Sequence, residues 1–283
     1  MCFAGDVLPK EMIRSAAKRA VDTWLPALGL AYRSYRENHA SFPALDTPFG
    51  FELAGSEQMA SGPFESDEIA CFLENIPAAS ACIDVGANVG LYSCLAASRG
   101  KHVVAVEPLA SKLSLLLENL LRNGFKDAEV YPVALAQAPG IAQLYGGGTA
   151  ASLLPGWAAT PEHWNRKVSA TTLDVLTGTR FDGSKLLIKI DVEGFEFDVL
   201  RGAEHTLSMS PKPTWLVEIC LNENFRSGLN EKFVETFEVF WRHGYQARVA
   251  APQAQAVQPE DVSRWVTRRS VDFGTHNYLF IPL

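Results

Sequence analysis

From residue 81 onward, short apolar runs alternate with stretches of helical periodicity, and this alternation restricts the folds open to the chain. The runs that predict strands cover residues 81–85, 101–107, 129–136, 185–191, 215–219 and 278–281. Helical spacing of apolar residues covers residues 91–98, 111–123, 196–207 and 231–243. Strands that alternate with helices predict a parallel sheet covered on both faces. In such α/β folds ligands bind just beyond the carboxyl ends of the strands, so the chemistry is sought there.

The residues before this alternating region have a different character. Residues 9–36 show helical periodicity with a basic side, which predicts a helix packed on its own domain or, alternatively, one that binds a membrane surface or a partner. Residues 41–62 are rich in Pro, Gly and Ser and predict irregular structure, and a helix is predicted over 66–75. We therefore expect an N-terminal helical extension, residues 1–48, and one α/β domain, residues 49–283.

Composition excludes several classes of protein. The 283 residues carry a formal net charge of −7, so general nucleic-acid binding is not expected. No apolar run approaches the ~20 residues needed to span a bilayer. Charged residues near the N-terminus, among them Lys10 and Glu11, break any signal-peptide core. The five cysteines are irregularly spaced without a Cys-x-x-Cys pair, so we expect reduced thiols in a cytoplasmic protein.

A glycine-rich turn, DVGANVG, follows the first predicted strand. Gly86 and Gly90 allow a tight turn and a close approach of the backbone to a ligand. The helix that begins near residue 91 offers unpaired N–H groups to a carboxylate, and Asp84 can accept a hydrogen bond from an ammonium group. A zwitterionic amino-acid moiety suits both, although a plain strand-to-helix turn would need the same glycines.

An acid at the end of the next strand narrows the choice of ligand. Glu107 lies 21 residues after Gly86 and can hold both hydroxyls of a ribose. A dinucleotide would require Gly-x-Gly-x-x-Gly, in which the second glycine admits the pyrophosphate, but this chain has Asn88 there. The pattern therefore favours S-adenosylmethionine over NAD. Gly86, Asn88 and Gly90 would cradle its amino-acid part with support from Asp84, and the backbone near Ala134 would bond the adenine.

Five segments of the α/β region occur in a characteristic order and spacing: CIDVGANVGLYS, VVAVEP, TTLDVL, LLIKIDVEGFEFDVLRGA and NYLFIP. Over residues 49–282 the chain resembles the FkbM family of methyltransferases. The resemblance implies a class I methyltransferase (Rossmann-like) fold, whose seven-stranded sheet is mostly parallel with one antiparallel strand and has helices on both faces. It also implies S-adenosylmethionine as methyl donor and usually a hydroxyl oxygen as acceptor, often on a sugar or natural product.

The fourth strand end, KIDVEGFE, predicts the catalytic side of the site. Asp191 should lie across the switch point from the first strand, close to the transferring methyl, where it can act as a general base or orient the acceptor hydroxyl. It can also simply cap the following turn. Lys189 lies inside a buried strand and should pair with a carboxylate, whereas Glu196 reads as a residue that favours a helix N-terminus.

A second acid, Glu218, lies near the end of the fifth predicted strand and should face the acceptor together with Asp191. The two carboxylates would suit Mg²⁺, but two acids alone do not make a metal site, so no metal is predicted. His163 and His276 are alternative bases, each also consistent with a surface position.

The sequence contains no motif that identifies the methyl acceptor. The loop-like stretch 146–167 is rich in glycine and aromatic residues and can close over an acceptor, and a second loop is predicted over 250–260. We expect a small-molecule or glycan acceptor, and the sequence leaves the oligomeric state open. Two rival functions remain, an NAD-dependent oxidoreductase on a related fold and a non-catalytic domain that binds a partner.

Overall fold

The computed structural model describes residues 42–251 and 255–283, together with residues 29, 31, 32 and 35. Most of the predicted N-terminal extension, including nearly all of the helix predicted over 9–36, lies outside the described residues. Within the described part, no helix is both long and apolar enough to cross a membrane.

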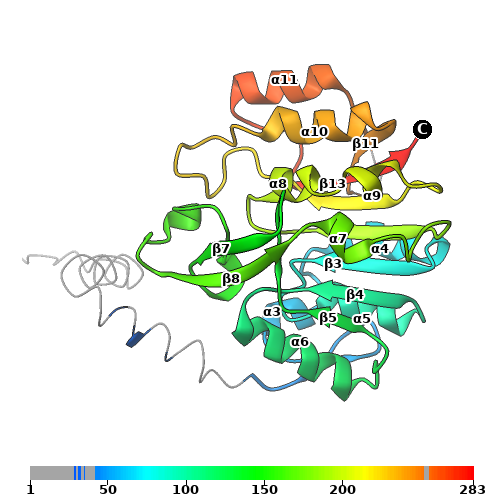
Figure 1. Ribbon diagram of the computed structural model, residues 1–283, viewed down its shortest axis with the longest axis vertical. Helices are drawn as coiled ribbons and strands as arrows, with labels where there is room; N and C mark the ends of the chain where they lie inside the picture. The colour runs from blue at the N-terminus through cyan, green and yellow to red at the C-terminus, as the bar shows by residue number, and fades with distance from the viewer. Residues whose placement is uncertain (1–28, 30, 33–34, 36–41, 252–254) are drawn as a thin grey trace, which may run out of the picture. The chain divides into compact units, whose positions relative to one another are not determined.

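The central sheet has eight strands in the order β12-β11-β13-β10-β9-β3-β4-β5 (Figure 1). Their bounds are β3 Ala81–Val85, β4 His102–Val106, β5 Glu129–Tyr131, β9 Leu186–Ile190, β10 Thr214–Glu218, β11 Tyr245–Val249, β12 Ala256–Val257 and β13 Asn277–Pro282. Strands β5, β4, β3, β9 and β10 are parallel, and β13 is antiparallel to both β10 and β11. The prediction of seven strands was one short, because the two-residue β12 adds an edge strand.

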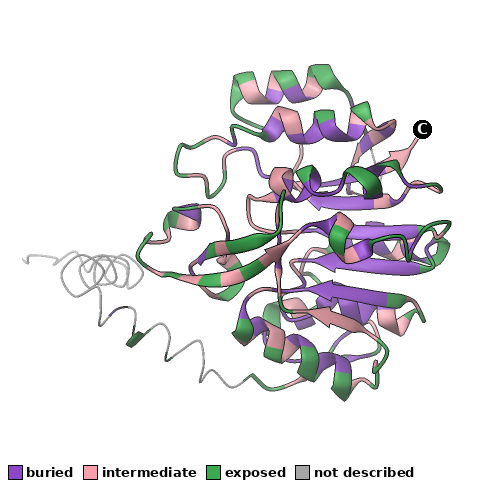
Figure 2. Cartoon of the chain, viewed as in Figure 1, coloured by how far each residue is buried: buried purple, intermediate pink, exposed green. Residues whose placement is uncertain are grey.

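Helices cover both faces of this sheet, as the alternation of strands and helices predicted. One face packs against α4 Ser66–Asn75, α5 Leu91–Ser98 and α6 Ala110–Arg122, and the other against α8 Glu196–Arg201, α9 Glu204–Ser208, α10 Phe233–Arg242 and α11 Pro259–Arg268. Neighbouring strand residues alternate between the two cores, since Leu187 packs on the first and Ile188 on the second. The sheet strands are accordingly buried along most of their length, whereas the helices keep an exposed side (Figure 2).

A second, smaller sheet departs from the prediction. The run 129–136 is not one strand: β5 ends at Tyr131, and β6, Ala134–Leu135, pairs instead with β8, Asn165–Thr171. Pro132 lies between them and has no N–H to continue the ladder. β8 also pairs antiparallel with β7, Gly140–Tyr145, so this three-stranded sheet replaces part of the loop predicted over 146–167.

Two other predicted elements differ from the structure. The helix predicted over 196–207 is divided into α8 and α9, with Gly202 between them. A Cβ at Gly202 would lie 2.3 Å from the carbonyl oxygen of Ala136, so the chain passes closest to the small sheet at a residue without a side chain. The loop predicted over 250–260 contains β12 and the first residues of α11.

Candidate active site

The turn between β3 and α5 is formed by glycines for two different reasons. Gly86 has a φ of +81°, and a Cβ there would lie 1.8 Å from the carbonyl oxygen of Asp191. Its N–H donates to the carbonyl of Val106 at 3.0 Å, which joins the turn to β4. Gly90 also has a positive φ, but a Cβ there would meet Leu116 of α6 at 2.5 Å. Gly86 thus permits contact between two strand ends, and Gly90 permits helix packing.

Glu107 follows β4 and lies beside this turn. One carboxylate oxygen accepts from the backbone N–H of Asn88 at 2.8 Å, and the other accepts from that of Leu109 at 2.7 Å. Burial raises the pKa of Glu107 to about 7, against the opposing effect of these two hydrogen bonds. The side-chain Oδ1 of Asn88 is buried and has no partner among the described residues. The carboxyl group of Glu107 is therefore held in place by two hydrogen bonds, and the side-chain oxygen of Asn88 remains available to accept one.

A cavity that opens to solvent lies beyond the carboxyl ends of the parallel strands. Its lining includes residues predicted for the site, namely Gly86, Asn88, Glu107, Ala134 and Asp191. Asp84, Gly90 and Glu218 are not among the lining residues. The structure therefore places five of the eight predicted site residues in the lining of one cavity, and the other three outside that lining.

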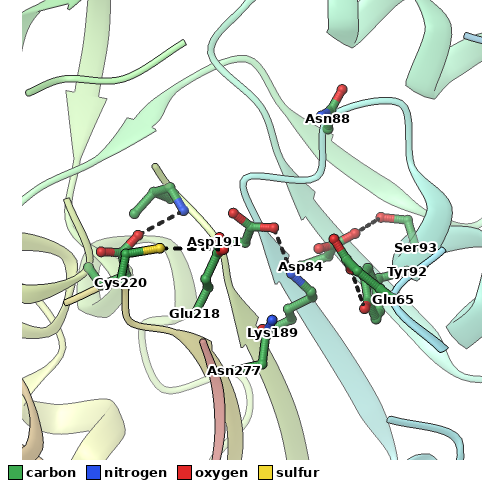
Figure 3. A network of polar contacts seen from close by, with 12 residues as sticks. Glu65, Asp84, Asn88, Tyr92, Ser93, Lys189, Asp191, Glu218, Cys220 and Asn277 are labelled. Atoms are coloured by element: carbon green, nitrogen blue, oxygen red, sulfur yellow. Dashed lines mark hydrogen bonds and ion pairs between the residues drawn. The ribbon is translucent and has the colours of Figure 1, made fainter. Parts of the chain in front are cut away.

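Asp84 lies under the cavity rather than in its lining. It is only 2% exposed and accepts a hydrogen bond from Ser93 Oγ of α5 at 2.6 Å (Figure 3). Burial raises its pKa, while Ser93 and the charge of Lys189 act in the opposite direction. Asp84 and Lys189 are paired in the parallel register of β3 and β9, so their side chains share one face of the sheet.

Lys189 is the centre of a buried polar network. Its Nζ lies 2.9 Å from Asp191 Oδ2 and 4.4 Å from the ring centroid of Tyr92, which confirms the prediction that this lysine pairs with a carboxylate. The Tyr92 hydroxyl donates to Glu65 at 2.7 Å. Burial alone would lower the pKa of Lys189, but Asp191, Glu65 and Asp84 raise it, so the lysine is cationic. The Lys189 ammonium group thus forms an ion pair with Asp191 and interacts electrostatically with Glu65 and Asp84, which come from two other segments (Figure 3).

Asp191 and Glu218 form a pair with unequal proton affinities. Burial tends to raise the pKa of Asp191, but Lys189 and a hydrogen bond from Glu218 hold it below its ordinary value. Burial and the adjacent Asp191 charge together raise the pKa of Glu218 well above its ordinary value. The two pKa shifts therefore have opposite directions, and Asp191 is the acid of the pair that loses its proton more readily.

The loop before β8 reaches the same site through two side chains. Trp157 Nε1 donates to Glu193 Oε2 at 2.7 Å, and Ser152 Oγ donates to the Glu193 carbonyl at 2.6 Å. Burial and the charge of Asp191 raise the pKa of Glu193 to about 8. Glu196 instead accepts from the N–H of Gly194 at 3.0 Å, in keeping with the predicted role at a helix start.

The two histidines considered as bases lie elsewhere. His163 lines a separate, open hollow together with Phe225 and Arg226, and it is not part of the cavity lining. His276 precedes β13, where its Nε2 lies 3.8 Å from Glu223 Oε1. Neither histidine contacts Asp191 among the interactions of the described residues.

Sequence reasoning missed Glu65 and Tyr92. Glu65 lies between the irregular stretch predicted over 41–62 and the helix predicted over 66–75, and it has a left-handed φ of +42° at the N-cap of α4. Tyr92 lies in the first turn of α5, where its aromatic ring gave only a core signal. A buried lysine with several acidic neighbours was the available hint, because such a charge requires partners that the strand ends alone do not supply.

Comparison with known families decides what class of protein has this cavity. Residues 84–247 match the family model described as the methyltransferase FkbM domain, which is more than half of the chain. The chain belongs to the FkbM methyltransferase family. The FkbM match begins at Asp84 and ends in β11, so it includes Glu107, Asp191 and Glu218 but neither Glu65 nor His276.

Solved structures with a similar fold have low sequence identity. The ribosomal protein L11 methylase from Lactobacillus delbrueckii subsp. bulgaricus is 11% identical with a TM-score of 0.42, over 80% of this chain and 78% of that one. A tRNA (uracil-54, C5)-methyltransferase from Pyrococcus abyssi, in complex with S-adenosyl-L-homocysteine, is 10% identical with a TM-score of 0.41, over 85% and 44%. A SAM-dependent O-methyltransferase from Thermotoga maritima is 11% identical with a TM-score of 0.39, over 85% and 77%. Comparison with curated proteins gives no match.

Proposed function

We propose that this FkbM-family protein transfers a methyl group from S-adenosylmethionine to a hydroxyl oxygen of a small molecule or glycan. The observation that carries the proposal is the cavity itself, which has Glu107 at one strand end and Asp191 at another, with the Gly86 backbone between them. A donor that extends from Glu107 past Gly86 to Asp191 would place its ribose near Glu107 and its methyl group toward Asp191.

The residues present fit such a donor. S-adenosylmethionine carries an ammonium and a sulfonium group and supplies an electrophilic methyl. Asn88 lines the cavity, and its Oδ1 offers an unused acceptor for an N–H or O–H group of the donor. Each Glu107 oxygen accepts one backbone hydrogen bond, which leaves further lone pairs for the two ribose hydroxyls. Ala134 and Val133 would flank the adenine.

Asp84 and Gly90 support this donor site indirectly. Asp84 binds Ser93 in the first turns of α5 and faces the Lys189 charge, so it fixes the helix that follows the glycine turn. Gly90 lets α5 and α6 approach one another. Their contribution is to hold the turn that carries Gly86 and Asn88, and neither needs to touch the donor.

Asp191 is the residue we propose to act on the acceptor. Transfer to oxygen requires the hydroxyl to lose its proton, and an ionised carboxylate in the cavity can accept that proton. Lys189 favours the ionised form of Asp191, and a hydrogen bond with the Glu218 carboxyl group favours it further. Glu218 does not line the cavity, so we assign the contact with the acceptor to Asp191 alone.

Calorimetry with the full chain tests the donor assignment. S-adenosylmethionine should bind in the micromolar range, and NAD should not bind. Glu107→Ala should weaken donor binding by about tenfold or more, since it removes two charge-assisted hydrogen bonds to the ribose. Glu129→Ala is the matched control, because Glu129 begins the neighbouring strand β5 and pairs with Arg180 outside the cavity. NAD binding without S-adenosylmethionine binding would support the oxidoreductase instead.

Transfer of a labelled methyl group to a panel of sugar and natural-product hydroxyls tests the reaction. Asp191→Asn should retain donor binding yet lower the transfer rate by about 10²–10⁴-fold, the usual loss when a general base is removed. A wild-type protein that binds the donor but modifies no hydroxyl, including those of lysate glycans, would favour the non-catalytic binding domain.

A further inference from the structure

A cluster of three different metal-binding side chains lies at the ends of β10 and β13, apart from the cavity lining. Cys220, Glu223 and His276 each present a ligand atom, and these atoms lie within 4.8 Å of one another. It is the one such group of three or more in the part of the chain that the structure describes. Cys220 is buried, His276 is partly buried, and Glu223 is exposed. The cluster thus has an inner thiol and an outer, movable carboxylate.

Backbone hydrogen bonds fix two of the three ligands relative to each other. The N–H of Ile219 donates to the carbonyl of His276 at 2.7 Å, which extends the pairing of β10 with β13 by one step. Asn230, itself 6% exposed, donates its side-chain N–H to the carbonyl of Cys220 at 2.9 Å. The Cys220 and His276 positions are therefore set by the fold, and only Glu223 has to adjust.

The same location has an excess of unsatisfied polar atoms. Buried side-chain atoms without a hydrogen-bond partner number six among the described residues, and three of them fall on consecutive positions, His276 Nδ1, Asn277 Oδ1 and Tyr278 Oη. Asn277 is 7% exposed and Tyr278 is fully buried. Neighbouring strand residues face opposite sides of the sheet, so Asn277 and Tyr278 cannot both face one ligand. His276 Nδ1 is the unpaired atom that belongs to the cluster, and since native proteins rarely leave such an atom unpaired, it indicates a ligand there.

The local charge also favours a cation. Glu223 places a carboxyl group within 4.8 Å of the Cys220 and His276 ligand atoms, and the Cys220 thiol donates to Glu218 Oε1 at 3.7 Å. The buried Lys189 is already paired with Asp191 (Figure 3). Figure 3 also shows Cys220 beside Glu218, with Asn277 below Glu218.

We propose that Cys220, Glu223 and His276 bind a divalent transition-metal ion of the Zn²⁺ type. Thiolate, imidazole and carboxylate together are a ligand set that Zn²⁺ prefers, whereas Mg²⁺ prefers oxygen ligands alone. Zn²⁺ bonds of about 2.0–2.3 Å require the three donor atoms to approach one another somewhat, which rotation of the exposed Glu223 side chain permits. Three protein ligands leave a fourth tetrahedral position open. The Cys220 proton leaves to solvent on binding, as metal ligation by thiols requires.

The proposed ion would tie the loop after β10 to the start of β13, directly behind Glu218. It is independent of the donor assignment, since none of its ligands lines the donor cavity. It also differs from the sequence expectation of no metal, which considered only Asp191 and Glu218. The spacing Cys-x-x-Glu with a distant histidine has no recognisable metal motif, so the fold alone brings the three together.

Titration of the metal-free full chain with CoCl2 tests the site without any assay of activity. One equivalent of Co²⁺ should bind, produce the absorption band of cobalt bound by a thiolate, and be displaced by Zn²⁺. Cys220→Ser should abolish this band. Glu223→Gln and His276→Gln should weaken Co²⁺ binding by at least about tenfold each, a loss seen even when groups outside the ligand shell are removed.

Matched controls separate the site from other thiols and histidines. Cys71→Ser removes a different buried thiol, and His163→Gln removes a different loop histidine, so both should leave the band and the affinity unchanged. Glu223 is exposed, so its variant should fold normally even if a variant of the buried Cys220 does not. The proposal is overturned if Co²⁺ gives no thiolate band, or if the band and affinity survive in Glu223→Gln. Donor calorimetry on the same protein shows separately whether the methyl-donor site is intact.

Discussion

The two halves of the cavity are built by different means. On the side of β3 and β4, Glu107 and Asn88 lie on adjacent turns, and backbone N–H groups close by fix the carboxyl group of Glu107. On the side of β9 and β10, Asp191 depends on Lys189 and Glu218, whose own partners come from segments far along the chain. The first half is therefore a local backbone construction, and the second is a tertiary network of charges.

This difference predicts how each half fails. The half of the cavity formed by backbone groups of β3 and β4 should tolerate changes of side chain. It should not tolerate extra atoms where the backbones of two strand ends are in contact. A charge network tolerates small changes of shape but not the removal of one charge, because the groups left behind are buried and unpaired. The following substitutions test that distinction, beginning with the one that should cost the most stability.

Gly86→Ala should be the most damaging single change. Its Cβ would lie 1.8 Å from the carbonyl oxygen of Asp191, and backbone on both sides leaves nothing flexible to move. We expect a loss of about 4 kcal/mol or more in the free energy of unfolding, or no folded protein. Gly100→Ala is the control, since Gly100 has a similar positive φ but no atom within 4 Å of the added Cβ. Equal losses in urea unfolding of the two variants would show that φ strain, and not the strand contact, requires Gly86.

Lys189→Met should destabilise the other half by about 3–5 kcal/mol, because it leaves buried carboxylates without their cation. The methionine keeps a similar volume, so lost charge and not a cavity would be measured. Lys232→Met is the matched control, since Lys232 pairs with Glu235 in an exposed position where an ion pair contributes about 0–1 kcal/mol. Urea unfolding at neutral pH compares them, and similar losses would contradict a buried network centred on Lys189.

The same contrast explains what the sequence could predict. Gly86, Asn88 and Glu107 follow strands whose Val and Ile runs are recognisable, so their convergence on one cavity followed from the parallel topology. Asp191 was found for the same reason. The small β6-β8-β7 sheet was missed because β6 has only two residues and because β7 and β8, although longer, are partly exposed and have no buried apolar run.

The network behind Asp191 could be predicted only in part. A buried lysine at position 189 required a carboxylate, and the strand ends supplied Asp191. Glu65 could not be predicted, because nothing in a Pro- and Gly-rich stretch before α4 marks one acid as buried. The opposite pKa shifts of Asp191 and Glu218 are also a tertiary effect, since Lys189 forms its ion pair with Asp191.

The pH dependence of stability should reveal Glu107. Its pKa is raised by burial from an ordinary 4.5 to about 7 in the folded protein. Between these values the folded state keeps a proton that the unfolded state loses, so this group makes the protein less stable as the pH rises from 4.5 to 7. Glu107 should contribute up to about −1.4 kcal/mol per pH unit to the slope, and Glu107→Gln should lack this contribution. Glu193 and Glu196, whose pKa values burial also raises, contribute in both proteins, so the difference between the two slopes belongs to Glu107.

Urea unfolding of wild type and Glu107→Gln at several pH values between 5 and 7 measures that difference. Glu129→Gln is a control of opposite sign, because Arg180, Tyr131 and His102 outweigh burial and lower the pKa of Glu129 to about 2. Its contribution should change between pH 2 and 4.5 and stay constant above. Parallel stability curves for wild type and Glu107→Gln would mean that Glu107 titrates normally and is not a buried carboxyl group.

Trp157→Phe should have the smallest effect on stability of these substitutions. It tests the contact between the loop before β8 and Glu193. The substitution keeps an aromatic ring against Phe225 but removes the N–H that binds Glu193 at 2.7 Å. Loss of one such bond should cost about 1–3 kcal/mol, because it leaves a buried carboxyl oxygen unsatisfied. Phe225→Leu alters the same ring contact without touching Glu193, so the excess loss in Trp157→Phe isolates the hydrogen bond.

If Glu193 belongs to the charge network, Trp157→Phe should also raise the KM for the acceptor while donor affinity measured by calorimetry stays constant. A change in donor affinity instead would place the Trp157 loop over the donor half of the cavity.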